Sequence, residues 1–157
     1  MQVFLVRHAE ASAETIAVRD PHRPLTGPGR RQARALGDRL RWHDCVPTHV
    51  WSSPLVRAVQ TAELVIAGIQ HEVTVDIAPL LAPDGSARDL AAALKALPAT
   101  SVVLLVGHEP SLSAIGAVLL GAPDFDALDK ACAARVDDGH LRWRFAWDAD
   151  APVAAGR

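Results

Sequence analysis

The sequence predicts an α/β fold, a three-layer α/β/α sandwich whose mainly parallel sheet carries an antiparallel edge. Short, wholly apolar segments alternate with amphipathic helical segments, which is the order of a parallel sheet with helical crossovers. Half of the 157 residues are hydrophobic and 22% are charged, as in a folded globular protein. The last two strand-like segments meet at Asp138-Gly139, a hairpin turn signal that predicts the antiparallel edge.

The first strand and the first helix enclose a long loop. Residues 3–6 are wholly apolar, which suits a strand buried on both faces. Residues 9–25 have no sustained period, so we predict a loop there, and long loops in compact domains are usually functional. Thr26 lies at or next to the N-cap of a helix that ends near Trp42. The buried stripe of this helix is Ala33, Leu36, Gly37 and Leu40.

The next strand and helix repeat this order. Residues 49–51 predict a short strand. Ser53 predicts the N-cap of the following helix, because Pro54 would then occupy the first helical position. Gly68 predicts the end of that helix, and residues 73–77 alternate in the manner of a strand.

A further helix, strand and helix follow. Residues 86–97 predict an amphipathic helix that Pro98 stops. Residues 101–106 predict a second continuous apolar strand, which begins with Ser101, and residues 110–120 predict an apolar helix closed by Gly121.

The C-terminal segment supplies the antiparallel edge. Residues 131–136 and 140–147 predict the two strands of the hairpin. We expect the tail at 148–157 to be frayed. No internal repeat, linker or low-complexity block interrupts the chain, and its length suits one domain over residues 1–157.

Charge and cysteine content exclude several function classes. Lysine and arginine total 16 against 18 acidic residues, and a formal charge of −2 lacks the basic balance of a nucleic-acid binder. Cys45 and Cys132 form no CxxC motif, which excludes a zinc ribbon or a disulfide framework and predicts reduced thiols. The apolar run at 3–6 is too short for a signal peptide or a membrane span. We therefore expect a cytoplasmic protein with no membrane or nucleic-acid partner.

Two of the predicted strands end in the same way, at Arg7-His8 and at Gly107-His108. Ligands of open α/β sheets bind beyond the carboxyl ends of the strands, so we expect both imidazoles at one site. Arg57 lies in the first turns of a helix, where the helix dipole favours an anion rather than a cation. Arg57 and Arg7 together predict a phosphoryl site, because planar guanidinium groups match phosphate oxygens.

Other motifs fail on inspection. His108-Glu109 begins like the zinc-protease pattern HExxH but no second histidine follows, and Thr26-Gly27-Pro28-Gly29 lacks the lysine of a phosphate-binding P-loop. No cluster of acidic residues predicts a two-metal phosphatase, so we expect neither a metal nor a cofactor. The remaining histidines are assigned to the surface or the core: His22, His43, His49, His71 and His140.

Four segments, in order, resemble the signatures of the histidine phosphatase (phosphoglycerate mutase-like) superfamily. Residues 7–10 resemble its RHG[E/D] motif, and residues 106–110 resemble the strand end that carries its second histidine. Residues 23–33 match its PLT-x-x-G-x-x-QA segment, and residues 52–62 match SSP-x-x-RA-x-QTA. Each segment alone is a weak signal, but the four together are specific and span most of the chain.

This resemblance implies a phosphoglycerate mutase-like fold and a metal-independent phosphatase. By resemblance, His8 is the nucleophile that carries the phosphoryl group, and Arg7, Arg57 and His108 hold the phosphoryl oxygens. The small size and the lack of an inserted lid are most similar to the family's bacterial phosphohistidine phosphatases.

Two positions depart from the family pattern. Ala9 stands where the family usually has glycine, so this residue needs an ordinary backbone geometry. Leu80 stands where larger members carry an acidic residue that protonates the leaving group. Asp84 and Glu10 are the remaining candidates for that acid, and Arg23 is a further candidate for substrate contact.

The missing acid bears on the substrate. An alkoxide leaving group needs a proton from an acid. An imidazole leaves from a nitrogen whose conjugate acid has a pKa of about 6.5, so it is protonated without a dedicated acid. We therefore favour a phosphatase that acts on phosphohistidine in a protein. A small-molecule phosphomonoesterase acting on phosphorylated metabolites and a non-catalytic phosphoprotein-binding module stay open. The arginines of helix 28–42 would dock an acidic protein or form a solvated face: Arg30, Arg34 and Arg41.

Overall fold

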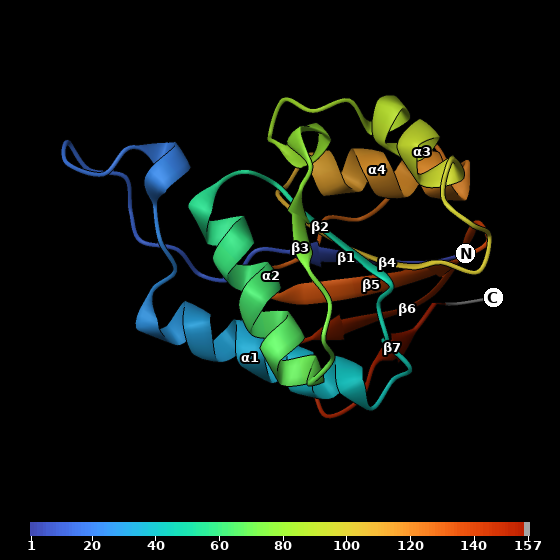
Figure 1. Ribbon diagram of the computed structural model, residues 1–157, viewed down its shortest axis with the longest axis horizontal. Coiled ribbons are helices and arrows are strands. Elements are labelled where there is room, and N and C mark those ends of the chain that lie inside the picture. The colour runs from blue at the N-terminus through green and yellow to red at the C-terminus, as the bar shows by residue number, and fades with distance from the viewer. Residues whose placement is uncertain (156–157) are drawn as a thin grey trace.

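The computed structural model describes residues 1–155 and contains one seven-stranded sheet in the order β3-β2-β4-β1-β5-β6-β7 (Figure 1). The strands are β1 (Gln2–Arg7), β2 (His49–Ser52), β3 (Val75–Ile77), β4 (Val102–Gly107), β5 (Cys132–Asp137), β6 (His140–Ala146) and β7 (Val153–Ala154). The first four are parallel, and the last three pair antiparallel. The predicted mainly parallel sheet with an antiparallel edge is therefore confirmed.

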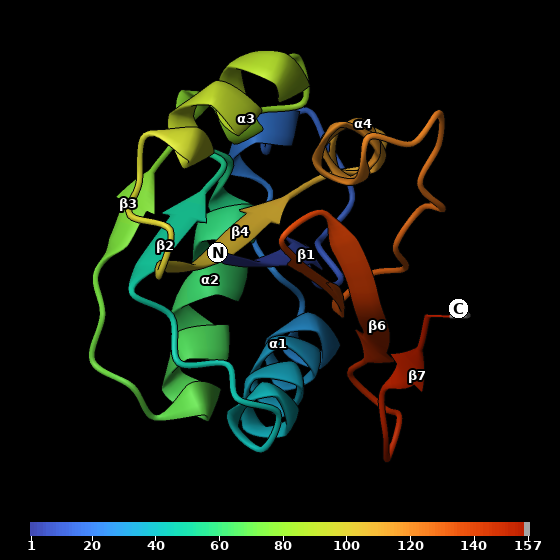
Figure 2. The ribbon, with the colours of Figure 1, turned by 90° about the vertical axis from the view of Figure 1, so that its right-hand side faces the viewer.

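Helices cover both faces of this sheet, as the edge-on view in Figure 2 shows. The helices α1 (Gly27–Arg41) and α2 (Val56–Ile69) lie on one face, and α3 (Ala87–Lys95) and α4 (Ser111–Leu120) lie on the other. Two short 3₁₀ helices, η1 (Asp20–His22) and η2 (Pro79–Leu81), interrupt loops. The chain thus forms the predicted three layers.

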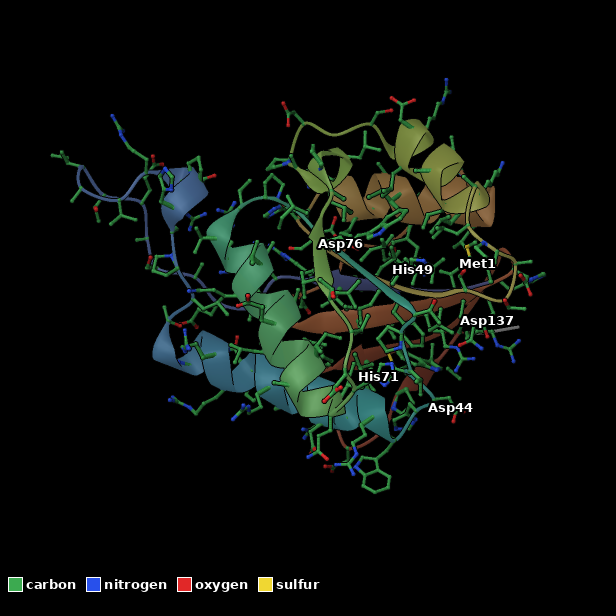
Figure 3. All side chains as sticks on the ribbon, in the orientation of Figure 1. Met1, Asp44, His49, His71, Asp76 and Asp137 are labelled. Atoms are coloured by element: carbon green, nitrogen blue, oxygen red, sulfur yellow. The ribbon has the colours of Figure 1, made fainter. Side chains whose placement is uncertain are left out.

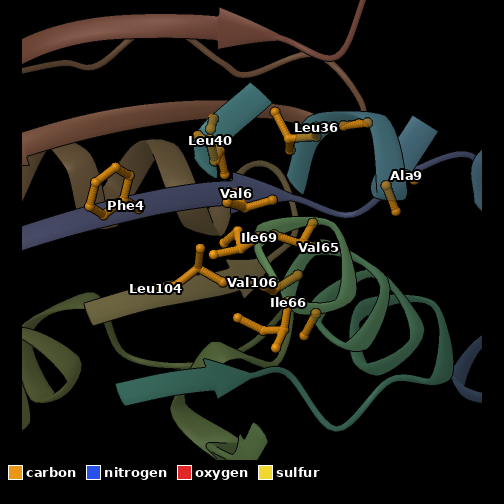
Figure 4. Packing of buried hydrophobic residues seen from close by; sticks show 14 of the residues in the cluster. Phe4, Val6, Ala9, Leu36, Leu40, Val65, Ile66, Ile69, Leu104 and Val106 are labelled. Carbon is orange, nitrogen blue, oxygen red and sulfur yellow. The ribbon is translucent and has the colours of Figure 1, made fainter. Parts of the chain in front are cut away.

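The central strands are buried on both faces, which explains their wholly apolar sequence. In β1, Phe4 and Val6 pack toward α1 and α2 (Figure 4), whereas Val3 and Leu5 pack in the cluster that contains α3 and α4 residues. All four are 4% exposed or less. This alternation follows from the two-residue period of a strand.

Glycines bring α1 and α2 into close contact. A Cβ on Gly37 would lie 2.1 Å from the carbonyl oxygen of Val65, and one on Gly68 would lie 2.4 Å from the carbonyl oxygen of Arg34. Both helices must therefore carry glycine at the crossing. This contact fixes α2, whose N-terminus reaches the carboxyl edge of the sheet.

Two predictions about α2 are wrong. Its N-cap is Leu55 rather than Ser53, whose hydroxyl accepts from the Leu55 N–H and also pairs with a histidine described below. Gly68 does not end the helix, because the chain continues to Ile69 and turns at Gln70, whose φ of 59° is left-handed. Gly68 is needed instead for packing against α1.

The predicted frayed tail is also partly wrong. Val153 and Ala154 form β7, which pairs with Arg144 and Trp143 of β6. Residues 156–157 lie outside the described part of the chain.

Candidate active site

The two histidines that follow β1 and β4 lie next to each other. These strands are parallel neighbours with Arg7 paired to Gly107, so the next residue of each, His8 and His108, leaves the sheet at the same edge. The ring centroids are 5.1 Å apart, and both side chains are buried.

The hydrogen bonds of His8 define its tautomer. Its Nδ1 lies 2.7 Å from the carbonyl oxygen of Ala9, which can only accept, so Nδ1 carries the proton. Its Nε2 accepts from the Nε–H of Arg57 at 3.3 Å. Nε2 therefore holds a lone pair, which a nucleophile toward phosphorus requires, and this lone pair faces Arg57.

Two side-chain nitrogens of the site lack hydrogen-bond partners. His108 uses Nε2 to pair with the Ser53 hydroxyl at 2.7 Å, which leaves Nδ1 free. Arg7 donates from Nη1 to the carbonyl of Leu128, which leaves Nε free. Within residues 1–155, His108 Nδ1 and Arg7 Nε are the buried side-chain nitrogen and oxygen atoms without a hydrogen bond. Buried polar atoms normally find partners, so this pair indicates the place of a polar ligand.

Burial keeps both imidazoles neutral. Desolvation, reinforced by the charges of Arg57, Arg7 and Lys130, lowers the pKa of His8 to about 4. The hydrogen bond to the Ala9 carbonyl acts in the opposite direction but is outweighed. Desolvation, followed by the neighbouring His8 and Arg57, lowers the pKa of His108 to about 3. Near neutral pH, His8 is therefore ready to donate its lone pair.

These lowered pKa values predict a pH-dependent stability. The folded-state pKa of His108 lies below the unfolded value of 6.5, so its contribution to stability is complete above pH 6.5 and is lost progressively as pH falls from 6.5 to about 3. Between pH 7 and 4.5, the unfolding free energy of wild type should fall by roughly 2 kcal/mol more than that of His108→Asn. Urea unfolding at both pH values measures this difference. Equal losses would show that the imidazole is not held neutral by the fold.

Polar side chains of the sequence motifs hold the loop that follows β1 in place. Thr61 of α2 accepts from the Ala9 N–H and donates to the carbonyl of Arg57, which ties the turn after β1 to α2. The side-chain oxygens of Gln32 and Gln60 accept from the N–H groups of Glu10 and Leu25. Ala9 itself is buried, and no positive φ is recorded there. The loop is thus held without the glycine usual in the family.

The site is a cavity of about 320 Å³ at the carboxyl edge of the sheet. It is lined by Arg7, His8, Ala11, Asp20, Arg23, Arg57, Pro83, His108, Glu109 and Lys130. The structure therefore places His8, His108, Arg7, Arg57 and Arg23 around one cavity.

Neither predicted acid reaches this cavity. The carboxylate of Glu10 instead accepts from the Thr26 hydroxyl, 2.7 Å away, at the start of α1. Asp84 is exposed and does not line the cavity, whereas its neighbour Pro83 does. Neither residue therefore belongs to the candidate site: the Glu10 carboxylate is bonded to Thr26, and Asp84 does not line the cavity.

Sequence reasoning missed four site residues. Asp20 and Lys130 lie in loops without a period, and Ser53 was assigned to a helix cap. Glu109 lies in the family motif at residues 106–110 without a predicted role, yet its carboxylate accepts from Leu128 N–H, Ser113 N–H and the Ser113 hydroxyl. A signal existed only for Ser53 and Glu109, which lie inside the family's motifs.

The other histidines lie outside the cavity. His49 stands at the amino end of β2, and His71 lies between α2 and β3, as Figure 3 shows. Among residues 1–155, no three His, Cys, Asp or Glu side chains gather in a group that could hold a metal. Over the same residues, no helix has the length and apolar character to cross a membrane.

The fold and the site define a class of protein: an α/β sandwich that presents two neutral histidines and several cations to one small cavity. The family model for the histidine phosphatase superfamily (branch 1) matches residues 3–81, and the chain belongs to this superfamily. The phosphoglycerate mutase-like resemblance found in the sequence is thereby confirmed.

Individual proteins that are similar to this chain in sequence or fold are also histidine phosphatases or share their fold. Phosphohistidine phosphatase SixA of Escherichia coli (strain K12) is 34% identical over 112 residues, which cover 70% of this chain and 68% of SixA. The solved structure of the protein histidine phosphatase SixA complexed with tungstate has a TM-score of 0.85 at 27% identity, covering 94% of this chain and 97% of that one. A mycobacterial glucosyl-3-phosphoglycerate phosphatase solved with VO3 shares the fold, with a TM-score of 0.68 at 19% identity over 98% of this chain and 99% of the other.

Proposed function

We propose that this protein is a phosphohistidine phosphatase that removes the phosphoryl group from a histidine of a protein. One observation carries the proposal: the unprotonated Nε2 of His8 and the two unpartnered nitrogens, His108 Nδ1 and Arg7 Nε, belong to residues lining one cavity. A nucleophile and donors that have no protein partner suit an oxyanion that reacts where it binds. The similarity to SixA supports the same substrate class.

The reaction has two displacements. The lone pair on His8 Nε2 attacks phosphorus, the P–N bond to the substrate imidazole breaks, and that imidazole leaves with the bonding electrons and takes a proton. Water then attacks the phosphoryl group on His8, which regains its lone pair as inorganic phosphate leaves. The Nδ1–H bond to the Ala9 carbonyl keeps the ring oriented through both steps.

The remaining groups stabilise charge on the phosphoryl oxygens. Arg7 offers its free Nε–H, and Arg57 has N–H donors left over beyond those bonded to His8 and Asp20. With the Ser53 hydroxyl donating to Nε2 of His108, the His108 Nδ1–H becomes a third donor. Donors fixed before the reaction need no reorganisation when charge builds up.

The carboxyl groups of the cavity support a P–N rather than a P–O substrate. The carboxyls that line it are Asp20, which is paired with two arginines, and Glu109, which accepts three hydrogen bonds. Both are held as acceptors, so neither suits the donation of a proton to an alkoxide. A leaving imidazole does not require that donation.

Substrate comparison tests this proposal. We expect kcat/KM for a protein phosphorylated on histidine to exceed that for sugar phosphates by at least about 10²-fold, the usual contribution of a positioned acid. A clear preference for the esters would favour the small-molecule phosphomonoesterase instead. Binding of the phosphoprotein without any turnover would favour the non-catalytic module.

We also propose that catalysis is independent of metal, because the guanidinium groups of Arg7 and Arg57 supply the positive charge that a metal would bring. Turnover should survive prolonged EDTA treatment, and added Mg²⁺ or Zn²⁺ should not raise it. Loss of activity in EDTA that a metal restores would contradict this. The free thiols of Cys45 and Cys132 are consistent with a reducing compartment such as the cytoplasm.

A further inference from the structure

A chain of charged contacts runs from the loop after β1 to the nucleophile. Arg23 donates to the Oδ1 of Asp20 from both Nε and Nη2, at 2.9 and 2.7 Å. Asp20 in turn accepts from Arg57, whose Nη1 reaches the Asp20 carbonyl at 2.9 Å and whose Nη2 reaches Oδ2 at 3.3 Å. Arg57 then donates from Nε to His8. Asp20 is therefore linked to the nucleophile through a single arginine.

Asp20 accounts for much of the fixed geometry of Arg57. A guanidinium has five N–H donors, and here one points to His8 and two point to Asp20. The Arg57 side chain is 6% exposed and that of Asp20 is 43% exposed. Asp20 is itself anchored, because Arg23 also donates to the carbonyl of Ser12. Without the Asp20 side chain, Arg57 would keep only the backbone carbonyl as a partner on that side.

Asp20 also places a negative charge in a cavity built for an anion. Burial opposes its ionisation, but the hydrogen bond from Arg23 and the charge of Arg57 lower the pKa of this carboxyl overall. The cavity then contains Arg7, Arg23, Arg57 and Lys130 against Asp20 and Glu109. A carboxylate bonded to Arg57 competes with phosphate for the same guanidinium and repels it.

We propose that Asp20 is a positioning residue that holds Arg57 against His8 and, through its charge, weakens the binding of inorganic phosphate so that product leaves. The inference rests on the proposed function for its role in turnover. Its effect on phosphate affinity is independent of turnover.

Two substitutions separate the two effects. Asp20→Asn keeps one oxygen, which can accept from Arg57 in place of Oδ2, but turns an NH₂ toward Arg23 in place of Oδ1 and removes the charge. Asp20→Ala removes both the oxygen and the charge. Asp124→Asn is the matched control, because Asp124 is exposed and lies outside the cavity. Isothermal titration calorimetry measures the affinity for inorganic phosphate. Turnover of a phosphohistidine protein gives kcat, and thermal unfolding checks that each variant is folded.

We expect both Asp20 variants to bind inorganic phosphate about fivefold more tightly than wild type, since a repelling charge is gone. Asp20→Asn should keep kcat within about threefold of wild type, and Asp20→Ala should lose about tenfold or more because Arg57 is no longer oriented. Unchanged or weaker phosphate binding in both variants, or wild-type kcat in Asp20→Ala, would overturn the proposal. If wild type bound phosphate but hydrolysed no phosphohistidine, the proposed function would fail while the affinity comparison still tested Asp20.

Discussion

Replacing His8 with alanine should abolish turnover, with a fall of at least about 10⁴-fold in kcat, because no other group can form the covalent intermediate. The Nε2 of His8 carries the lone pair that Arg57 faces, and its Nδ1 is hydrogen-bonded to the Ala9 carbonyl. Incubation with a phosphohistidine donor followed by rapid alkaline quenching should leave acid-labile, alkali-stable phosphate on wild type and none on His8→Ala.

The matched control is His71→Ala, which removes an imidazole from the segment between α2 and β3, outside the cavity. It should retain wild-type turnover and phosphate labelling. Thermal unfolding of both variants checks that the fold survives. Hydrolysis by a folded His8→Ala protein at a rate near that of wild type would end the covalent mechanism.

Arg57→Ala should have the second largest effect, a loss of about 10³-fold in kcat, in the range seen when arginine stabilises a phosphoryl-transfer transition state. Arg57 lies at the start of α2, is 5% exposed, and contacts both His8 and Asp20. The substitution would remove the N–H groups that Arg57 offers to phosphate and the N–H that faces the nucleophile.

Arg57→Lys separates charge from geometry. A lysine ammonium keeps the positive charge but cannot contact His8 and Asp20 in the fixed fork of a guanidinium. We therefore expect Lys to recover only a small part of the lost kcat, measured on the same phosphohistidine protein. Full recovery with Lys would show that only the charge matters at this position.

The strand ends of the site, and the place of Arg57 in the first turns of a helix, could be predicted from the sequence. Apolar runs ending in Arg7-His8 and Gly107-His108 place two imidazoles at one sheet edge, because parallel strands share a direction. Arg57 is recognisable because a cation at a helix N-terminus is unfavourable without an anion. These inferences depend on local sequence and on the topology of the sheet, which the apolar pattern largely determines.

Contacts between loops could not be predicted in this way. Asp20 meets Arg57 across 37 positions of chain, and no periodic pattern marks the loop from which it comes. Ser53 has the sequence of a helix cap, but its hydroxyl pairs with His108, and the helix begins later. The two-residue β7 is stabilised by pairing with β6 rather than by its own sequence. Each miss arises where a tertiary partner outweighs local preference.

A crystal structure with bound vanadate would examine the shared oxyanion site itself. We expect vanadium within bonding distance of His8 Nε2, with its oxygens accepting from Arg7 Nε, Arg57 and His108 Nδ1. Vanadate bound elsewhere, or bound here without contact to these donors, would contradict the site proposed for this protein.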